Sequence, residues 1–330
     1  MKKKVGVVCG GYSGEAAVSM KSAEMILKNI DRDKFDPIQM VLEPGNWYAS
    51  IDGNREKIDA NDFSFIHENE RHRPDLCLII VHGTPGEDGK LQGYFEMIGM
   101  PYTTGGVLNS SLTFNKQFTN DLLRQRGFNT AKNILLHHPD ECDADRIVND
   151  LSLPVFVKPN RGGSSLGISK VKEKSELREA VEKAYAQKSD VLIEEYLDGR
   201  EFTCGVICRQ NQFQALAVTE IATEREFFDY QAKYTHDQTR EITPAELPPE
   251  LYDECRSMSV KIARSLNCRG VVRIDYKLVK DAFFVIEVNT VPGMTEHSIV
   301  PQQAAPLGIS KTEIINEMIQ TALDQPEDFK

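Results

Sequence analysis

Residues 5–30 read VGVVCGGYSGEAAVSMKSAEMILKNI, and this stretch determines the fold class. An apolar run at 5–9 precedes a glycine-rich turn at 10–14, and apolar residues then recur at helical spacing over 15–30. The order strand, glycine turn, helix occurs again with a strand at 76–81 and a helix at 91–98. This alternation predicts a parallel α/β domain, in which ligands bind beyond the carboxyl ends of the strands.

The rest of the chain predicts two smaller α+β lobes. The middle segment contains a helix at 115–126, strands at 168–171 and 191–197, and a helix at 175–186 with Ser175 as its N-cap. The last segment is rich in strands, at 202–208, 215–221, 270–278 and 283–288. We therefore expect three units, at 1–114, 115–198 and 199–330. A long polar stretch at 223–249 is either a linker or a functional lid.

The composition is typical of a cytoplasmic globular enzyme. The 330 residues are 40% hydrophobic and 27% charged, with a net charge of -11. This balance argues against nucleic acid as a partner, because a broad basic face is needed to bind it. The longest apolar run is too short to cross a bilayer, so we expect no membrane partner. The seven cysteines are scattered, and Cys204 and Cys208 are expected to be core residues of a strand rather than metal ligands.

A glycine- and serine-rich loop, RGGSSLG at 161–167, is a candidate phosphate-binding loop. Its backbone N–H groups and hydroxyls could surround phosphate oxygens. A plain hairpin turn is the alternative. Lys158 lies just before the loop, and a cation beside such a loop favours nucleotide binding.

Two apolar runs, VRIDY at 272–276 and VIEVN at 285–289, carry polar residues at every second position. Strand periodicity places Arg273 and Asp275 on one face, and Glu287 and Asn289 on one face. Two carboxylates and an amide oxygen on adjacent strands form the oxygen-only site that Mg²⁺ prefers. The alternative is a buried ion pair of Arg273 with Asp275 or Glu287. Burying several charges without a ligand is costly, and this favours the metal.

Three further candidates lie next to predicted strands or glycine turns. The segment at 292–298 could offer backbone donors to a carboxylate or an oxyanion. Glu15 could hold an ammonium group, or it could only stabilise the first helix as a capping carboxylate. His82 is either functional or a polar residue satisfied by backbone.

These motifs occur together in one order along the chain: GGxSxE at 10–15 with Val18-Ser19, HGxxGEDG at 82–89, VKP at 157–159, GSSxG at 163–167, DYxAKY at 229–234, RxD at 273–275 and ExNTxPGMTxxS at 287–298. In this combination the sequence resembles the D-alanine–D-alanine ligases of the ATP-grasp superfamily, up to about Pro301. It departs from them at Gly162, where many members have Glu, and at Ala16, where Arg or His is frequent. These departures leave the chemical groups intact.

The resemblance implies an N-terminal Rossmann-like parallel-sheet domain followed along the chain by an ATP-grasp fold, in a homodimeric enzyme. Its substrates would be D-alanine and ATP, and its product would serve peptidoglycan synthesis. Two Mg²⁺ ions are implied, with Mn²⁺ as an alternative, and a monovalent cation is left open. The implied ATP and metal contacts are Lys116, Lys158 and Ser165 near the phosphates, Glu194, Glu195 and Leu197 at adenine, Glu201 at the ribose, and Asp275, Glu287 and Asn289 at the metals.

The resemblance also implies roles in catalysis through an acylphosphate and a tetrahedral intermediate. Glu15 would hold the first ammonium, with Ser164 and Tyr234 linked to it. Arg273 and the Gly293 N–H would stabilise the oxyanion, and Ser298 would bind the second carboxylate. The remaining implied site residues are His82, Lys233 and Ile299. Tyr234 could instead only pack the closed lid.

Two other interpretations stay open. A D-alanine–D-lactate ligase, or another ATP-grasp ligase of carboxylates and amines, would share the ATP site and differ in the lid and the acceptor pocket. A nucleotide-binding regulatory module without catalysis is the other interpretation. The presence of Arg273, the three candidate metal ligands and Ser298 argues against such a loss of activity.

Overall fold

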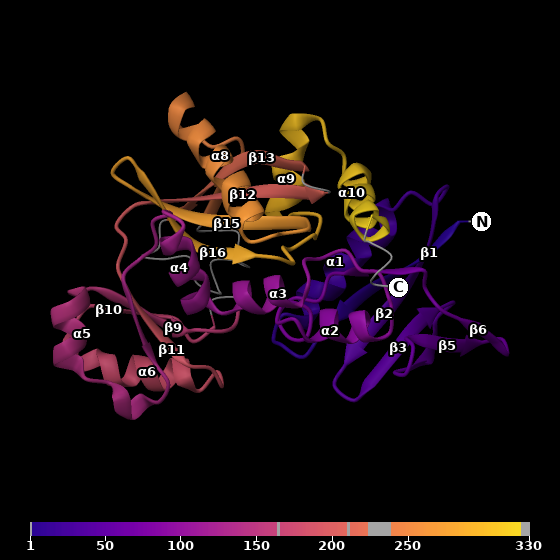
Figure 1. Cartoon of the computed structure of the whole chain (residues 1–330), viewed down its shortest axis with the longest axis horizontal. Coiled ribbons are helices and arrows are strands. Elements are labelled where there is room, and N and C mark those ends of the chain that lie inside the picture. The colour runs from indigo at the N-terminus through magenta and orange to yellow at the C-terminus, as the bar shows by residue number, and fades with distance from the viewer. Residues whose placement is uncertain (1, 164–165, 210–211, 224–238, 325–330) are drawn as a thin grey trace.

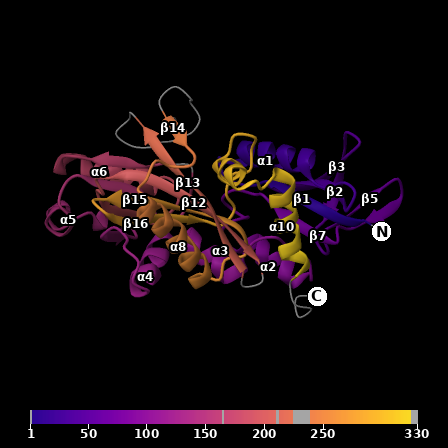
Figure 2. The same ribbon diagram turned by 90° about the horizontal axis from the view of Figure 1, so that it is seen from above.

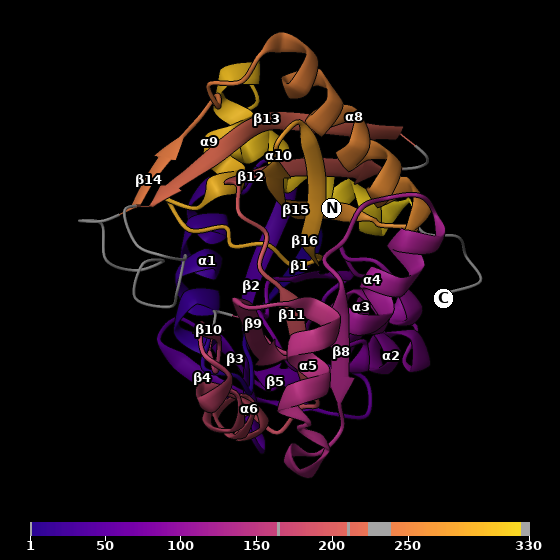
Figure 3. The same cartoon turned by 90° about the vertical axis from the view of Figure 1, so that its left-hand side faces the viewer.

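The computed structural model describes residues 2–163, 166–209, 212–223 and 239–324, and this part of the chain forms three β-sheets (Figure 1). The first sheet lies at one end of the molecule, and the other two face each other at the opposite end. Figure 2 shows the same separation from above, and Figure 3 shows the second sheet beneath the third.

The first sheet has seven strands in the order β6-β5-β4-β3-β2-β1-β7. β1 pairs in parallel with β7, as predicted, and also with β2. β2 to β6 form an antiparallel meander, and the sequence analysis predicted none of these five strands. Its strands are β1 (Lys3–Gly10), β2 (Phe35–Glu43), β3 (Asn46–Ile51), β4 (Asn54–Asp59), β5 (Ser64–His67), β6 (Glu70–His72) and β7 (Leu76–Ile79). The helices of this region are α1 (Ala16–Asn29), α2 (Lys90–Met97) and α3 (Val107–Phe114).

The second sheet has four antiparallel strands in the order β10-β9-β11-β8. They are β8 (Asn133–Leu136), β9 (Val155–Pro159), β10 (Ser169–Val171) and β11 (Val191–Glu195). The accompanying helices are α4 (Lys116–Gln125), the 3₁₀ turn η1 (Pro139–Glu141), α5 (Ala144–Leu151), the 3₁₀ turn η2 (Lys174–Glu176) and α6 (Leu177–Tyr185). The predicted N-cap at Ser175 is wrong, because Ser175 lies inside η2, and Glu173 and Glu176 form the capping box.

The third sheet has five antiparallel strands in the order β14-β13-β12-β15-β16. They are β12 (Arg200–Arg209), β13 (Gln212–Thr223), β14 (Thr239–Ile242), β15 (Gly270–Val279) and β16 (Ala282–Asn289). The remaining helices are α8 (Pro249–Ser265), α9 (Ile299–Ala304), the 3₁₀ turn η3 (Ala305–Leu307) and α10 (Lys311–Leu323).

Helix α10 connects the two ends of the chain. Its buried residues Ile315 and Ile319 belong to the same hydrophobic core as Val5 and Val7 of β1. The three sheets thus lie within the three predicted units, but the last helix packs on the first sheet (Figure 1). The division at residues 114 and 198 stays a prediction.

The cysteines agree with the expectations from the sequence. All seven cysteines are free, and Cys204 and Cys208 are buried in β12 as predicted. Among the residues described, we find no helix with the length and hydrophobicity needed to cross a membrane.

Candidate active site

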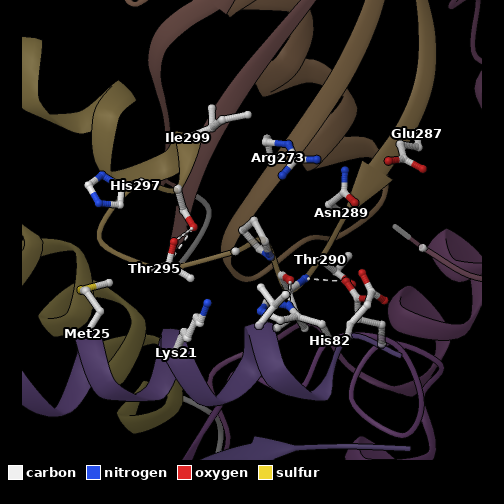
Figure 4. A pocket seen from close by; sticks show the side chains of 18 of the residues that line it. Lys21, Met25, His82, Arg273, Glu287, Asn289, Thr290, Thr295, His297 and Ile299 are labelled. Carbon is white, nitrogen blue, oxygen red and sulfur yellow. Dashed lines mark hydrogen bonds between the residues drawn. The ribbon is translucent and has the colours of Figure 1, made fainter. Parts of the chain in front are cut away.

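Two adjoining cavities lie where the three sheets meet. A large cavity of about 1090 Å³ separates α1 and the loop after β7 from the end of β16 (Figure 4). A small cavity of about 170 Å³ lies between the second and third sheets. Lys116, Arg273 and Glu287 line both cavities. A ligand in either cavity therefore lies next to the same three charged side chains.

Every described residue of the predicted site lines one of these cavities. The large cavity is lined by the shared residues and also by Glu15, His82, Gly293, Ser298 and Asn289. The small cavity is lined by Lys158, Glu194, Glu195, Leu197, Glu201 and Asp275. Ile299 lines both cavities. Ser164, Ser165, Lys233 and Tyr234 lie outside the described residues, as does most of the predicted lid.

The loop after β7 places His82 at the bottom of the large cavity (Figure 4). His82 is buried, with Nδ1 2.9 Å from the Val291 carbonyl oxygen and Nε2 3.3 Å from Ser22 Oγ. Ser22 Oγ also accepts the Met294 N–H at 3.2 Å, so its own proton is available to Nε2. Burial lowers the pKa of His82, against the opposing effect of the Glu15 carboxylate. The lowered pKa favours the neutral imidazole, which joins the first sheet to the segment after β16.

Glu87 lies beside His82 and was missed as a functional residue. Its carboxylate accepts the Gly83 N–H at 2.7 Å and the Val291 N–H at 3.3 Å. Burial raises its pKa to about 8, and the Glu15 carboxylate adds to the rise. The available signal was a carboxylate in a glycine-rich loop that directly follows a buried strand.

Glu15 precedes α1 and does not act as a side-chain cap of that helix. Its backbone N–H donates to Ser13 Oγ at 3.2 Å, and Ser13 Oγ donates to the His82 carbonyl at 3.0 Å. Its carboxylate faces the glycine-rich loop instead: a Cβ at Gly163 would lie 2.8 and 2.9 Å from the two carboxylate oxygens. Glycine at position 163 therefore allows the loop to approach Glu15 this closely.

The two predicted phosphate lysines are both in ion pairs. Lys158 Nζ lies 2.5 Å from Glu194 Oε2, with both side chains buried. Glu194 also accepts the Asn120 side-chain amide at 3.0 Å. Lys116 Nζ donates to the Gly162 carbonyl at 2.7 Å and lies 3.6 Å from Glu287 Oε2. The Lys116 ammonium thus contacts the glycine-rich loop, and Lys158 lines the small cavity together with Gly162 and Gly163 of that loop.

The candidate metal ligands lie on adjacent strands as predicted. Asp275 pairs with Glu287, and Arg273 with Asn289, in the register of β15 and β16. The Arg273 guanidinium donates to both Asp275 oxygens at 2.8 and 2.7 Å, so the ion pair considered as the alternative is also present. Burial alone would lower the pKa of Arg273, but Asp275 and Glu287 raise it well above its usual value.

The chemistry of this donor set fits a hard divalent ion. The Asn289 side-chain nitrogen donates to Asp275 at 3.0 Å, which leaves the amide oxygen as its ligand atom. In the described part of the chain, no three His, Cys, Asp or Glu side chains are grouped to hold a metal. An amide oxygen as the third donor still gives the oxygen-only set that suits Mg²⁺.

The small cavity is also lined by Phe156, Tyr196 and Leu197. The Glu195 N–H donates to the Lys132 carbonyl at 3.0 Å, and its carboxylate accepts the Lys132 N–H at 2.8 Å. Glu195 can therefore offer its backbone carbonyl, but not its N–H, to a base. Glu201 is paired with Lys277 at 3.1 Å.

The segment after β16 forms the other wall of the large cavity. Ser298 Oγ accepts the Thr295 N–H at 2.8 Å, and a Cβ at Gly293 would lie 3.0 Å from this oxygen. The Gly293 backbone and the Ser298 hydroxyl are thus adjacent. Figure 4 shows Thr295 and His297 of the same segment across the cavity from Lys21 and Met25 of α1.

Comparison with known proteins agrees with this architecture. Residues 4–105 match the family described as D-ala D-ala ligase N-terminus, and residues 122–320 match D-ala D-ala ligase C-terminus. A D-alanine–D-alanine ligase of Azobacteroides pseudotrichonymphae is 41% identical over 97% of this chain and 99% of its own length. One from Porphyromonas gingivalis is 41% identical over 99% of this chain and 100% of its own length.

Solved structures give the same result. The VanG D-Ala:D-Ser ligase of Enterococcus faecalis superposes with a TM-score of 0.88 at 31% identity, covering 98% of this chain and 100% of that chain. A Bacillus anthracis D-alanine–D-alanine ligase complexed with ATP gives 0.79 at 31% identity, covering 98% and 97%. The fold is thus an ATP-grasp fold, and the chain is a ligase. It belongs to the D-alanine–D-alanine ligase family.

Proposed function

We propose that this protein joins two D-alanine molecules into D-alanyl-D-alanine for peptidoglycan synthesis, with conversion of ATP to ADP and phosphate. The observation that carries this proposal is the pair of adjoining cavities that share Lys116, Arg273 and Glu287. The small cavity is lined as a nucleotide site, and the large one has room for two amino acids. A phosphoryl group passing from one to the other would meet the shared cations.

The reaction has two balanced steps. A carboxylate oxygen of the first D-alanine bonds to the γ-phosphorus while the bond from that phosphorus to the bridging oxygen breaks, and ADP leaves. The ammonium of the second D-alanine first loses a proton to solvent. The resulting amine attacks the acyl carbon of the acylphosphate and loses a second proton to solvent as the amide bond forms. The tetrahedral intermediate then expels phosphate. In such phosphoryl transfer, positioning and charge neutralisation provide most of the catalysis.

The described side chains have clear places in this scheme. Lys116 and Lys158 would neutralise the phosphates beside the glycine-rich loop. Glu15 would hold the first ammonium, and Arg273 with the Gly293 N–H would stabilise the oxyanion. Ser298 would bind the second carboxylate. Ser164, Ser165, Lys233 and Tyr234 keep their proposed roles on the family resemblance alone.

Asp275, Glu287 and Asn289 would hold Mg²⁺, and we propose two ions. When bound, the ions would supply positive charge to the phosphoryl oxygens. The surrounding residues would keep these ligands in place, since Arg273 and Asn289 both donate to Asp275.

The decisive test measures ADP release with ATP and Mg²⁺ in the presence of D-alanine, D-serine, D-lactate or L-alanine, with products identified by mass. We expect ADP formation that depends on D-alanine, with the dipeptide as the main product. ATP binding without turnover would support a regulatory module. A depsipeptide as the main product with D-alanine and D-lactate together would support the ester-forming alternative.

We further infer that two copies associate in the cytoplasm. Met97 and Leu108 are 88% and 79% exposed on neighbouring helices, and α3 carries no charged side chain. In a chain of net charge -11, the surface of α3, which has no charged side chain, is where a second copy can approach with least repulsion. Light scattering should give the mass of a dimer, and Leu108→Arg should shift it toward the monomer. A monomeric wild-type protein would contradict this inference.

A further inference from the structure

We propose that Asn160 is a positioning residue that holds Lys116 and Lys158 in place at the small cavity, next to the glycine-rich loop at 161–167, and thereby sets the affinity for nucleotide. This inference rests on the proposed binding of ATP in the small cavity. Asn160 lies outside the motifs quoted above, and its side chain contacts neither cavity. It would therefore act only through its neighbours.

Asn160 caps the helix that carries Lys116. Its side chain is fully buried, at 0% exposure. The Asn160 carbonyl accepts the Lys116 N–H at 3.1 Å, and its side-chain oxygen accepts the Gln117 N–H at 2.9 Å. The next N–H, of Phe118, donates to Asn115 Oδ1 at 3.1 Å. Asn160 thus provides partners for two of the N–H groups that the start of α4 leaves unpaired.

The same residue continues the strand that carries Lys158. Asn160 directly follows β9, and its N–H donates to the Asp190 carbonyl at 2.8 Å. Arg161 then forms a bridge with Asn115 and donates its N–H to Ser189 Oγ at 2.8 Å. Because Lys116 Nζ also donates to the Gly162 carbonyl, the described start of the loop rests on α4. Asn160 is the junction of β9, α4 and this loop.

The junction requires an amide at position 160. The Gln117 N–H needs an acceptor, and this fixes the Asn160 oxygen on that side. The Asn160 nitrogen is thereby directed at Asn115 Oδ1, to which it donates at 3.0 Å. A carboxylate has no donor, and it would place a negative oxygen against the Asn115 oxygen. At position 115 a carboxylate can replace the amide, because Asn115 Oδ1 acts only as an acceptor in these two contacts.

The same chemical change should therefore weaken nucleotide binding on one side of this hydrogen bond and leave it nearly unchanged on the other. We expect Asn160→Asp to weaken ADP and Mg-ATP binding, measured by calorimetry at pH 8, by about ten- to a hundredfold, the range expected when a buried hydrogen-bonding group loses its partner. We expect Asn115→Asp to stay within about threefold of wild type, since Asp is also a good N-cap. Gln117→Ala is the matched control, because it retains the backbone N–H that Asn160 accepts.

Two further readouts separate positioning from general stability. At lower pH the new carboxyl of Asn160→Asp becomes protonated and can donate again, so nucleotide affinity should recover relative to wild type. In steady-state assays the KM for ATP should rise, with the KM for D-alanine changed little. If Asn160→Asp does not fold, Asn115→Ala removes the acceptor from the other side and should also weaken nucleotide binding.

Nucleotide affinity within about twofold of wild type in folded Asn160→Asp, or in Asn115→Ala where that variant is used, would overturn the inference. So would equal losses in Asn160→Asp and Asn115→Asp. Since binding is measured without turnover, a wild-type chain that binds nucleotide but does not ligate would contradict the proposed function alone. A wild-type chain that binds no nucleotide would overturn both.

Discussion

The buried carboxyl of Glu87 should make the stability of this protein fall as pH rises. Glu87 accepts two backbone N–H groups, yet burial next to Glu15 and Glu287 raises its pKa from an ordinary 4.5 to about 8. The folded protein therefore holds this proton more tightly than the unfolded chain does. Below pH 4.5 both states are protonated, and stability from this group is fully present. It is lost as pH rises toward 8, where the folded carboxyl finally ionises.

The size of the effect follows from the difference in proton affinity. Each tenfold difference between the folded and unfolded states is worth about 1.4 kcal/mol, so the rise from 4.5 to about 8 sets an upper limit of about 5 kcal/mol. Relaxation of the loop around a charged Glu87 will reduce this figure, and we expect about 2–4 kcal/mol to be observed. Glu87→Gln cannot ionise and should lack this loss.

The assay compares the free energy of unfolding of wild type and Glu87→Gln between pH 5 and pH 9. The variant carries a constant cost, because its NH₂ group faces an N–H that the carboxylate accepted. As pH rises, the free energy of unfolding of the wild type should nevertheless fall relative to that of Glu87→Gln. Glu179→Gln, an exposed change in α6, controls for the loss of one negative charge. Parallel pH profiles for wild type and Glu87→Gln would refute the reasoning.

Three other changes test the site. Glu287→Gln should keep the fold and lower turnover by at least about a hundredfold, because the phosphoryl charge loses neutralisation; near-normal turnover at saturating Mg²⁺ would exclude Glu287 as a ligand. Gly163→Ala places a methyl group 2.8 Å from the Glu15 carboxylate and should raise the KM for D-alanine by about tenfold or more. Gly14→Ala is the control, because its Cβ would contact only Leu166, at 3.5 Å, and the KM should not change. Equal KM values in the two variants would remove Glu15 from the substrate site. Tyr234→Phe should lower dipeptide synthesis at pH 7 by about ten- to a hundredfold and allow D-alanyl-D-lactate to form; an unchanged product ratio, measured by mass, would leave Tyr234 a packing role only.

The elements predicted correctly are those whose apolar pattern is long and buried. The strand at 5–9 and the helix at 15–30 appear as β1 and α1 with ends shifted by one or two residues. The strands β3 to β6 were missed because they are short and because β4 and β6 are largely exposed, so they lack the long apolar pattern that marks a core strand. Asp52-Gly53, between β3 and β4, was an available turn signal.

The sequence predicted which side chains lie together at the two cavities, but not the hydrogen-bond partners that hold them there. Periodicity alone placed Arg273 and Asp275 on one face, and the structure confirms this arrangement. Glu87 and Asn160 could not be assigned in that way, since Glu87 bonds to Val291 and Asn160 to Asn115, both far along the chain. Such contacts depend on how the sheets meet, and this is decided by tertiary packing rather than by a local pattern.

The charges around the small cavity suggest why nucleotide and metal should bind together. Each lysine or arginine that the structure describes in its lining is paired with a carboxylate: Lys116 with Glu287, Lys158 with Glu194, Arg273 with Asp275 and Lys277 with Glu201. This pairing lets the charges stay buried when no ligand compensates them, since an unpaired buried charge costs several kcal/mol. A nucleoside triphosphate is a polyanion, and its entry alone would compete with these carboxylates for the same cations. Divalent cations at Asp275 and Glu287 would remove that competition, because they neutralise the carboxylates and leave Lys116 and Arg273 to the phosphates.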